Sequence, residues 1–310
     1  MLKETSIKAS IVIPTRNEEL SIERCLESIF GQTYRNFEVV VVDSSTDKTP
    51  QLAAKYDVIL VRQKPKGVAA AFNEGIRHAR GGIICLMAAD DTIAPDYLEE
   101  NLKPFLEPGV MGVYLPWKIV KPNTLIGKVF YYYYQIFIVK SKYSSWPLLW
   151  RREVFNDVVF DETLTVGEDA DFWKRVKKIA NNKNWEFRYR SGTYYFSDVD
   201  DTLLKNLRKS IWYGLGFVKV CRKDVSHLLK ILPIIFFSFS PFVIVMYLLT
   251  HNNVYLPWII LYCGSWFFVI LKGISKRILT WHLLFIPLLL TWRAVGHLIG
   301  IFVSFLGRKD

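Results

Sequence analysis

The sequence predicts an α/β domain with a mostly parallel sheet, followed by a membrane domain of two or three transmembrane helices. Strand-like and helix-like runs alternate over residues 9–115, and three long apolar runs fill residues 228–306. The charges divide in the same way, because all but one of the 29 acidic residues lie in the first 227 positions. We therefore expect an α/β domain over residues 1–227 and a membrane domain over residues 228–310.

The elements of the first domain follow from the spacing of its apolar residues. Short, largely β-branched runs predict strands at Ala9–Pro14, Phe37–Val42, Val58–Val61, Ile83–Met87 and Val110–Leu115. Apolar residues three or four apart predict helices at Glu18–Phe30, Gln51–Lys55, Val68–Ala79 and Pro95–Phe105. This alternation is typical of parallel sheets, whose ligands bind beyond the carboxyl ends of the strands.

Acidic residues follow three of the predicted strands, in segments 14–18, 43–47 and 90–91. Their convergence at one edge of a sheet is the first sign of a functional site. Asp90 and Asp91 come directly after a buried strand, and Mg²⁺ is typically held by one or two carboxylates together with phosphate oxygens. The alternative is that Asp91 or Thr92 caps the helix expected to begin near Pro95.

The C-terminal part carries the apolar runs Leu228–Thr250, Val254–Leu271 and Ile278–Leu306. Each is long enough to cross a bilayer as a helix; a buried helical hairpin of a soluble protein is the weaker alternative. The loop 272–277 is basic while the loop 251–253 is not, so the positive-inside rule places the basic loop in the cytoplasm. The N-terminus lacks the apolar core of a signal peptide. We therefore expect a multi-pass protein of the cell membrane with a cytoplasmic first domain.

Three segments leave alternatives open. The third apolar run holds Arg293 and His297, and it either spans with Arg293 near one end or lies partly in the interface. Residues 201–223 are basic and amphipathic, which predicts an interfacial helix at the membrane surface or a plain domain helix. The segment Leu125–Val139, with four consecutive tyrosines, is a second candidate for the interface.

The net charge of +11 indicates anionic partners, and we expect anionic lipids and a phosphorylated substrate rather than nucleic acid. No G-x-G-x-x-G follows the first strand and no G-x-x-x-x-G-K-[ST] occurs, so the sequence does not support a glycine-rich phosphate loop. The four cysteines have no metal-binding or redox spacing.

Six sequence blocks occur in the order of a known family. They are SIVIPTRNEE from Ser10, VDSSTDKT from Val42, NEGIRHARG from Asn73, LMAADD from Leu86, WRREVF from Trp150 and GEDADF from Gly167. Together they resemble the family 2 glycosyltransferases. The resemblance covers the first domain and implies a GT-A type fold that transfers a sugar, with inversion, from a UDP- or GDP-linked donor.

The resemblance also implies the residues that bind the donor. Those that line the nucleotide pocket or meet the base or ribose are Thr15, Asn17, Glu18, Asp43 and Asp47. Those beside the diphosphate are Lys66, Gly67 and Asn73. Asp90 corresponds to the aspartate that binds a divalent metal ion, Mg²⁺ or Mn²⁺, and Asp91 is its neighbour in the substrate site.

The pair Glu168–Asp169 is implied as the catalytic group, with Asp169 as the base that takes a proton from the acceptor hydroxyl. Repulsion within the trio Glu168, Asp169 and Asp171 would raise one of their pKa values toward a useful range. The alternative is an ordinary helix start, where acidic residues favour the helix dipole.

The chain departs from the family pattern at several positions. Ala88 stands where the usual Asp-x-Asp begins, and the block from Asp43 to Asp47 is one residue shorter than the commonest version. A histidine often found near the end of the domain is not evident around Tyr194–Asp198, and the Gln-x-x-Arg-Trp signature of processive synthases is missing.

These observations predict a membrane-anchored glycosyltransferase that acts on a lipid or a lipid-linked glycan at the cytoplasmic face. Ala88 motivates a second hypothesis, a non-catalytic nucleotide-sugar sensor or membrane scaffold on a degenerate glycosyltransferase fold. A nucleotidyltransferase is a third, weakened because the expected triphosphate loop is missing.

Overall fold

A computed structural model of the 310-residue chain describes residues 7–138, 148–190, 192–199, 201–223, 229, 231–278 and 280–306. The chain divides into two compact units. Unit 1 comprises Met1–Ile119 and Ser141–Asp198, and unit 2 comprises Val120–Lys140 and Val199–Asp310. The expected boundary at residue 227 thus differs from the boundary of these units, because the helices of segments 120–140 and 201–223 pack with the C-terminal helices.

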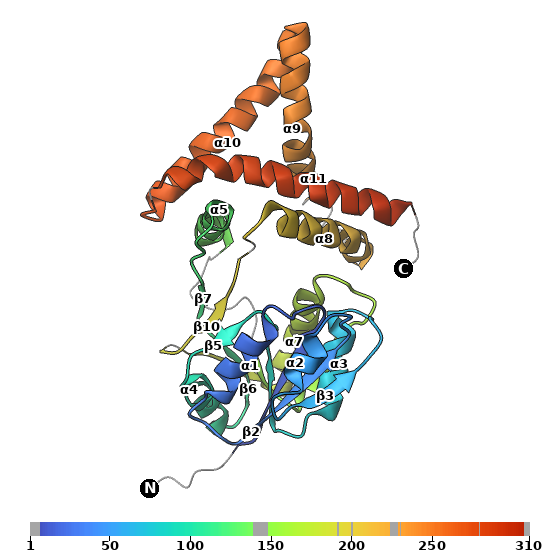
Figure 1. The fold of residues 1–310 in the computed structure, drawn as a ribbon, viewed down its shortest axis with the longest axis vertical. Helices are drawn as coiled ribbons and strands as arrows, with labels where there is room; N and C mark the ends of the chain where they lie inside the picture. The colour runs from blue at the N-terminus through green and yellow to red at the C-terminus, as the bar shows by residue number, and fades with distance from the viewer. Residues whose placement is uncertain are drawn as a thin grey trace. The chain divides into compact units, whose positions relative to one another are not determined.

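Unit 1 is built on a seven-stranded sheet with the strand order β3-β2-β1-β4-β8-β6-β9 (Figure 1). The strands are β1 (Ala9–Thr15), β2 (Phe37–Asp43), β3 (Ile59–Arg62), β4 (Ile83–Leu86), β6 (Val110–Tyr114), β8 (Leu149–Arg151) and β9 (Glu186–Tyr189). Only β8 runs antiparallel to its neighbours in this sheet. The prediction of a mostly parallel α/β sheet is therefore confirmed.

Helices cover both faces of this sheet. They are α1 (Ile22–Phe30), α2 (Thr49–Ala53), α3 (Val68–His78), α4 (Tyr97–Leu102), the 3₁₀ turn η1 (Lys103–Leu106), α6 (Val154–Asp157) and α7 (Glu168–Lys183). α1 begins at Ile22 rather than at Glu18, because the backbone N–H groups of Ser21 and Ile22 close a turn onto the Glu18 carbonyl. The helix expected at Gln51–Lys55 begins two residues earlier, with Pro50 in its first turn.

The core lies on both sides of the sheet, and alternate residues of each central strand enter opposite clusters. Ile11 and Ile13 of β1 pack with α1, α2 and α4, whereas Val12 packs with α3, α6 and α7. Gly75 of α3 lies so close to β1 that an added Cβ would come within 2.3 Å of Val12 Cγ1. Burial on both faces explains why these strands read as continuous apolar runs.

Unit 1 also contains a second sheet, of three strands. It consists of β5 (Thr92–Ile93), β10 (Tyr195–Ser197) and β7 (Trp117–Ile119) in the order β5-β10-β7. β10 pairs antiparallel with β5, so the residues just before β5 lie beside those just after β10. This pairing joins parts of the chain about a hundred residues apart.

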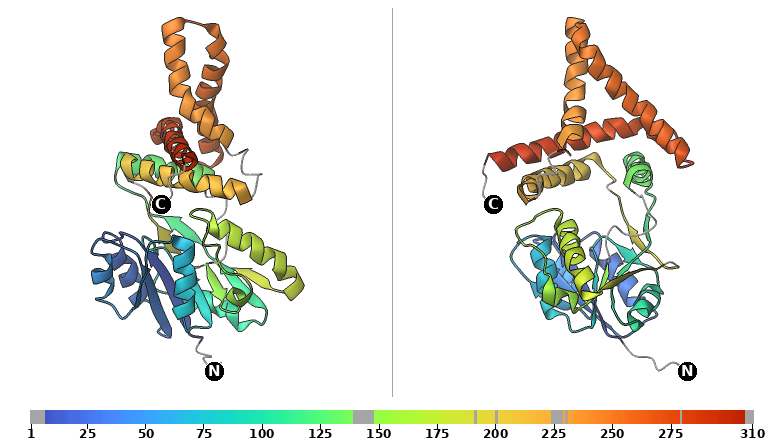
Figure 2. Two further views of the ribbon diagram at one scale, coloured as in Figure 1. Left: turned by 90° about the vertical axis from the view of Figure 1, so that its right-hand side faces the viewer. Right: turned by 180° about the vertical axis from the view of Figure 1, so that it is seen from behind.

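Unit 2 is helical. Its helices are α5 (Leu125–Tyr133), continued by the π-helical turn η2 (Tyr134–Ile138), α8 (Leu203–Lys223), α9 (Ile231–Thr250), η4 (Asn253–Tyr255), α10 (Leu256–Ser275), η5 (Trp281–Phe285) and α11 (Ile286–Phe305). Three stretches are long and apolar enough to cross a membrane, namely Ile231–Thr250, Asn253–Ser275 and Trp281–Ser304. α9 and α10 form a hairpin whose turn lies far from α8 and α11 (Figures 1 and 2).

Glycines allow α8 and α11 to cross at very short range. A Cβ on Gly300 would come within 2.1 Å of the Ile211 carbonyl oxygen, and one on Gly214 within 2.2 Å of the His297 carbonyl oxygen. Gly296, one turn before Gly300, faces Ser210. Only residues without a side chain fit this G-x-x-x-G contact.

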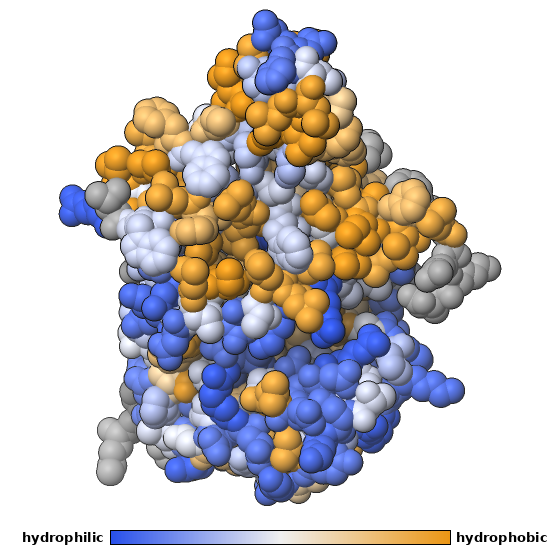
Figure 3. Space-filling model, turned by 45° about the horizontal axis from the view of Figure 1, so that its top comes forward, coloured by the Kyte–Doolittle hydropathy of each residue, from blue (hydrophilic) through white to orange (hydrophobic). Residues whose placement is uncertain are grey.

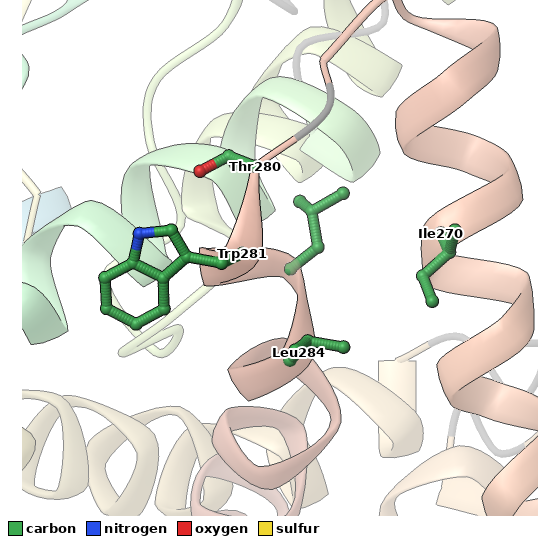
Figure 4. A pocket seen from close by; sticks show the side chains of 5 residues that line it. Ile270, Thr280, Trp281 and Leu284 are labelled. Carbon is green, nitrogen blue, oxygen red and sulfur yellow. The ribbon is translucent and has the colours of Figure 1, made fainter.

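The surface of unit 2 is strongly apolar. Figure 3 shows hydrophobic side chains over much of the visible face of the C-terminal helices, and Phe242, Leu248 and Phe268 are each more than half exposed. A groove of about 290 Å³ between α10 and η5 is lined by Ile270, Thr280, Trp281, Leu283 and Leu284 (Figure 4). Its mostly apolar lining suits lipid chains rather than a polar substrate.

Candidate active site

The carboxyl ends of four neighbouring parallel strands meet at one edge of the large sheet. Thr15 pairs with Asp43, and Asp43 with Arg62, at the ends of β1, β2 and β3. β4 runs parallel to β1, with Val12 opposite Leu86, so Asp90 and Asp91 follow at the same edge. The residues that follow these four strands therefore converge at one edge as expected, while their role as a site stays a prediction.

Asp43 is fully buried at this edge and is held from several sides. Thr15 Oγ1 and Ser45 Oγ donate to its Oδ1 at 2.7 and 2.6 Å, and Arg62 forms an ion pair with its Oδ2. Its carboxylate thus fixes the ends of three strands. The contact of Asp43 with a base or ribose stays a prediction.

The loops after β1 and β2 are tied to one another. Asn17 has a positive φ of 60°, which asparagine tolerates better than most residues. Its backbone N–H donates to Ser45 Oγ at 2.7 Å, and its side-chain Oδ1 accepts from the Thr46 N–H at 2.9 Å. These bonds give the two loops one fixed shape.

Glu18 and Asp47 add further hydrogen bonds at the loops after β1 and β2. The Glu18 N–H donates to Thr49 Oγ1 at 2.8 Å, and Asp47 accepts from the N–H groups of Glu19 and Thr49 at 3.3 and 3.0 Å. Both predicted residues therefore organise the rim of the edge, while their contact with a nucleotide stays a prediction.

Lys66 and Gly67 lie at the start of α3, just after β3. Both are exposed, and Gly67 has a φ of 96°, which glycine adopts without strain. Because α3 leaves the carboxyl edge, its positive N-terminal end lies there together with the Lys66 charge. This arrangement suits the diphosphate that the sequence predicts at these residues.

Asn73 is buried within α3 and is fully engaged with another segment. Its Nδ2 donates to the Phe160 carbonyl and to Glu162 Oε1, both at 2.9 Å, and its Oδ1 accepts from the Phe160 N–H at 2.9 Å. The amide thus fastens segment 160–162, which leads to α7. Its predicted position facing the diphosphate is not tested by these contacts.

Asp90 and Asp91 sit at the end of the small sheet beside Asp198. Ser197 Oγ donates to Asp91 Oδ1 at 2.5 Å, and Arg24 forms an ion pair with Asp198 at 2.5 Å. Burial, and then the charges of Asp90 and Asp198, raise the pKa of Asp91 to about 7. Arg24, Ser197 and Asp198 were not predicted as site residues.

A divalent cation suits this acidic group chemically. Among the described residues, the carboxylate of Asp90 has no hydrogen bond or ion pair, and its charge works against the ionisation of Asp91. No set of three His, Cys, Asp or Glu side chains in the described ranges is arranged to hold a metal by itself. A metal at Asp90 would therefore need further oxygens, such as those of a bound diphosphate.

Glu168 and Asp169 open the 16-residue helix α7, after Gly167 with a φ of 73°. Burial, followed by the charge of Asp169, raises the pKa of Glu168 to about 7, and burial also raises the pKa of Asp169. Within the described chain, Glu168 Oε2 is enclosed without a hydrogen-bond partner. Glu168 is thus poised to exchange a proton near neutral pH, and burial makes Asp169 a stronger base than a solvated aspartate.

Aromatic packing fixes the position of this helix start. Phe172 is fully buried, with its ring 4.3 Å from that of Phe160 and 5.2 Å from that of Trp150, measured between ring centroids. Trp150 belongs to β8, so these rings anchor the first turn of α7 to the large sheet. A rigidly held carboxylate is what proton transfer in a site demands.

The direction of α7 places its first turn at the carboxyl edge. β9 begins at Glu186, just after α7 ends at Lys183, and β9 is parallel to β6. The end of α7 therefore lies at the amino edge, and its length of about 24 Å returns its start to the opposite edge. Glu168 and Asp169 thus share an edge with Asp43 and Asp90, although no hydrogen bond or ion pair between described residues joins the three groups.

A mostly parallel sheet covered by helices on both faces, with acidic groups at its carboxyl edge, matches the GT-A type fold that the sequence predicts. Residues 10–148 match the model of the family described as "Glycosyl transferase family 2". The segment 10–148 therefore carries the sequence pattern of this family. The fold and the family predicted from the sequence blocks are therefore confirmed.

The chain is similar to several named enzymes. It is 29% identical over 258 residues to dolichyl N-acetyl-alpha-D-glucosaminyl phosphate 3-beta-D-2,3-diacetamido-2,3-dideoxy-beta-D-glucuronosyltransferase of Methanococcus voltae, which covers 72% of this chain and 77% of that protein. It is 29% identical over 124 residues to UDP-Glc:alpha-D-GlcNAc-diphosphoundecaprenol beta-1,3-glucosyltransferase WfgD of Escherichia coli, covering 38% of this chain and 49% of that one.

Two further proteins match this chain over other fractions of its length. The similarity to glycosyltransferase GlyA of Streptococcus pneumoniae serotype 4 is 27% over 217 residues, which is 60% of this chain but only 31% of GlyA. Among solved structures, the mannosyltransferase PcManGT from Pyrobaculum calidifontis, in complex with GDP-Man and Mn²⁺, has a TM-score of 0.55 at 20% identity. That alignment covers 94% of this chain and 87% of the mannosyltransferase and shows a shared fold.

Proposed function

We propose that this protein transfers a sugar, with inversion, from a UDP- or GDP-linked donor to a lipid or lipid-linked glycan at the cytoplasmic face of the membrane. The observation that carries the proposal is the shared edge of the large sheet. There the residues around Asp43, the acidic group at Asp90 and the helix start at Glu168–Asp169 all lie toward the carboxyl ends of the parallel strands.

The residues divide the chemistry between them. The tied loops of Asn17 and Asp47 shape a nucleotide pocket, and the start of α3 with Lys66 attracts the diphosphate. Asp169, assisted by Glu168, takes the proton from an acceptor hydroxyl. Asp90 would hold a divalent metal, which would neutralise charge on the departing nucleoside diphosphate. If the acceptor nucleophile is a phosphate, no base is needed and Asp169 orients the substrate.

Two findings support a membrane-bound acceptor. Unit 2 contains three stretches able to cross a membrane, and its large apolar side chains are exposed. The similar enzymes of Methanococcus voltae and Escherichia coli are named for dolichyl phosphate-linked and diphosphoundecaprenol-linked acceptors. The cytoplasmic side rests on the basic loop 272–277.

The test is sugar transfer by full-length protein in membranes, with UDP- and GDP-sugars and a lipid acceptor extract. We expect Asp169→Asn to reduce kcat by about 10²- to 10⁴-fold while binding of UDP or GDP, measured by calorimetry, is kept. The matched control is Asp171→Asn in the same helix turn, whose carboxylate pairs with Arg175 at 2.8 Å. It should change kcat by less than about threefold. Near-normal turnover of Asp169→Asn would remove the base from the mechanism.

The anomeric configuration of the product tests the inversion separately, by NMR of the released glycan. A product with the donor's own configuration would contradict it. Ala88 still favours the second candidate, a sensor or scaffold that binds nucleotide-sugar without reaction. Binding of UDP- or GDP-sugar without any transfer or hydrolysis, with every acceptor fraction, would establish that candidate instead.

A further inference from the structure

We propose that the guanidinium group of Arg293 binds the phosphate of a membrane lipid. Arg293 lies in α11, in the middle of the apolar stretch Trp281–Ser304. Its Nη1 is enclosed, and its guanidinium makes no hydrogen bond or ion pair with any described residue. An enclosed cation without an anion is costly, so this group calls for a negatively charged ligand.

Unit 2 itself offers no anion for this role among its described residues. Their only acidic side chain is Asp201, which already pairs with Lys205 at 3.0 Å. The immediate contact of Arg293 is the ring of Tyr133 in α5, with the guanidinium carbon 5.2 Å from the ring centre. A ring holds a guanidinium in place by one face and leaves its N–H groups available to a phosphate.

The face of α11 that carries Arg293 is also polar and close to α8. His297 lies one turn later and stacks on Tyr213 of α8, with ring centres 6.0 Å apart. Ser210 of α8 lies against Gly296, is 1% exposed, and its Oγ has no hydrogen-bond partner among the described residues. An unpartnered hydroxyl therefore lies against α11 at Gly296, three residues after Arg293.

The position of Arg293 along the helix fits a lipid head group rather than lipid chains. If α11 crossed the bilayer, the middle of the stretch would lie at its centre, where a charged side chain is disfavoured. If α11 lies along the interface, the same residue lies at the level of the phosphates. Of the two arrangements that the sequence leaves open, the central position of Arg293 in the stretch 281–304 favours the one in which α11 lies partly in the interface.

The proposal shares the membrane location with the proposed function but does not depend on sugar transfer, so its test uses lipid binding alone. Full-length protein in non-ionic detergent is mixed with phosphatidylglycerol, a polyprenyl monophosphate or the corresponding polyprenol, and bound lipid is counted by native mass spectrometry. We expect both phosphate-bearing lipids, or one of them, to be retained, and Arg293→Met to weaken that retention about ten- to hundredfold. Retention of phosphatidylglycerol would assign a bilayer phospholipid, and retention of polyprenyl monophosphate alone would assign the acceptor carrier.

The matched control is Arg277→Met, which removes the same charge from the exposed basic loop and should leave retention within about twofold. Arg293→Lys keeps the charge without the forked donors and should give intermediate retention. In lipid-free detergent, Arg293→Met should melt at the same temperature as the unmodified protein or higher, because it removes an uncompensated charge. The proposal would be overturned if Arg293→Met retained as much phosphate-bearing lipid as the unmodified protein. It would also be overturned if the unmodified protein retained the polyprenol as well as the polyprenyl monophosphate, or if Arg277→Met lost as much lipid as Arg293→Met.

Discussion

Glu168 occupies an environment that opposes its charge, and this affects the stability of the protein. Its folded-state pKa is raised from 4.5 to about 7 by burial and by Asp169, so the folded state binds the proton more tightly than the unfolded chain. Stability is therefore lost as the pH rises from about 5 through 7. We expect Glu168→Gln to increase the free energy of unfolding at pH 8 by about 1–3 kcal/mol, with little change at pH 5.

Thermal unfolding at the two pH values measures this effect. The control is Glu153→Gln, at an exposed glutamate, which should change the free energy of unfolding by less than about 0.5 kcal/mol at both pH values. If Glu168→Gln destabilises the protein at pH 8, the carboxylate has a favourable partner in solution and the strained environment is refuted. A gain in stability together with a loss of transfer would identify a residue kept for function.

Asn73 shows how a residue assigned to the ligand can also hold the fold. Asn73→Asp keeps the acceptor for the Phe160 N–H but replaces Nδ2, which makes both donated bonds, with an oxygen that faces the Phe160 carbonyl and Glu162. We expect a loss of about 2–4 kcal/mol in unfolding free energy at pH 8, and a smaller loss at pH 5, where a protonated acid can donate again. Chemical denaturation at both pH values measures it.

The control for that substitution is Asn156→Asp, at an exposed position, which should stay within about 0.5 kcal/mol of the unmodified protein. Equal effects of the two substitutions would mean that the bonds from Asn73 to segment 160–162 do not form. Because that segment leads to Glu168, transfer activity should fall with stability in Asn73→Asp.

At the scale of elements, α8 and α11 depend on a contact that admits no side chain. Gly300→Ala would place its Cβ against the Ile211 carbonyl, which belongs to the backbone and cannot rotate away. We expect the helices to separate locally at a cost of about 1–3 kcal/mol. Gly264→Ala in α10 is the control, because nothing lies within 4 Å of its added Cβ. Melting temperatures in detergent compare the two, and an equal response would show that the crossing does not exist in solution.

The sequence predicted the elements whose pattern is local. β1, β2 and β4 are runs of β-branched and apolar residues buried on both faces, and α1 repeats its buried residues at Ile22, Cys25, Leu26 and Ile29. The first residue of a helix differs from the prediction where backbone hydrogen bonds decide it, as at the turn on Glu18 before α1. The six sequence blocks indicated the family, which the spacing of apolar residues does not reveal.

The parts that the sequence could not predict depend on long-range pairing. β5 and β10 have two and three residues, too few to show a period, yet their pairing brings Asp198 and Ser197 to Asp91. Arg62 joins Asp43 only because β2 and β3 end in register. α5 and α8 group with the C-terminal helices because they pack against them. The composition of the sequence does not show this packing, so it predicts a domain boundary at residue 227 instead.

At the scale of the whole molecule, the membrane topology is the strongest consequence of the charge pattern. α9 and α10 are each about 30 Å long, the thickness of the hydrocarbon core, and form a hairpin. α8 carries basic residues along its length, among them Lys205, Lys209 and Lys219, and we therefore expect it to lie at the membrane surface. Since α11 crosses α8 at backbone contact, we expect α11 to stay at that surface too.

Single cysteines at positions 253, 275 and 304 test this arrangement. Cys25, Cys85 and Cys221 are buried, so only the exposed Cys263 needs replacement, by alanine. In intact cells a membrane-impermeant maleimide should label Asn253→Cys alone, and Ser275→Cys and Ser304→Cys should react only after the membrane is opened. Labelling of Ser304→Cys from outside would show that α11 spans, which would move Arg293 to the bilayer centre and remove its access to a lipid phosphate. Labelling of Ser275→Cys from outside would instead reverse the orientation, because the basic loop it flanks then faces away from the cytoplasm.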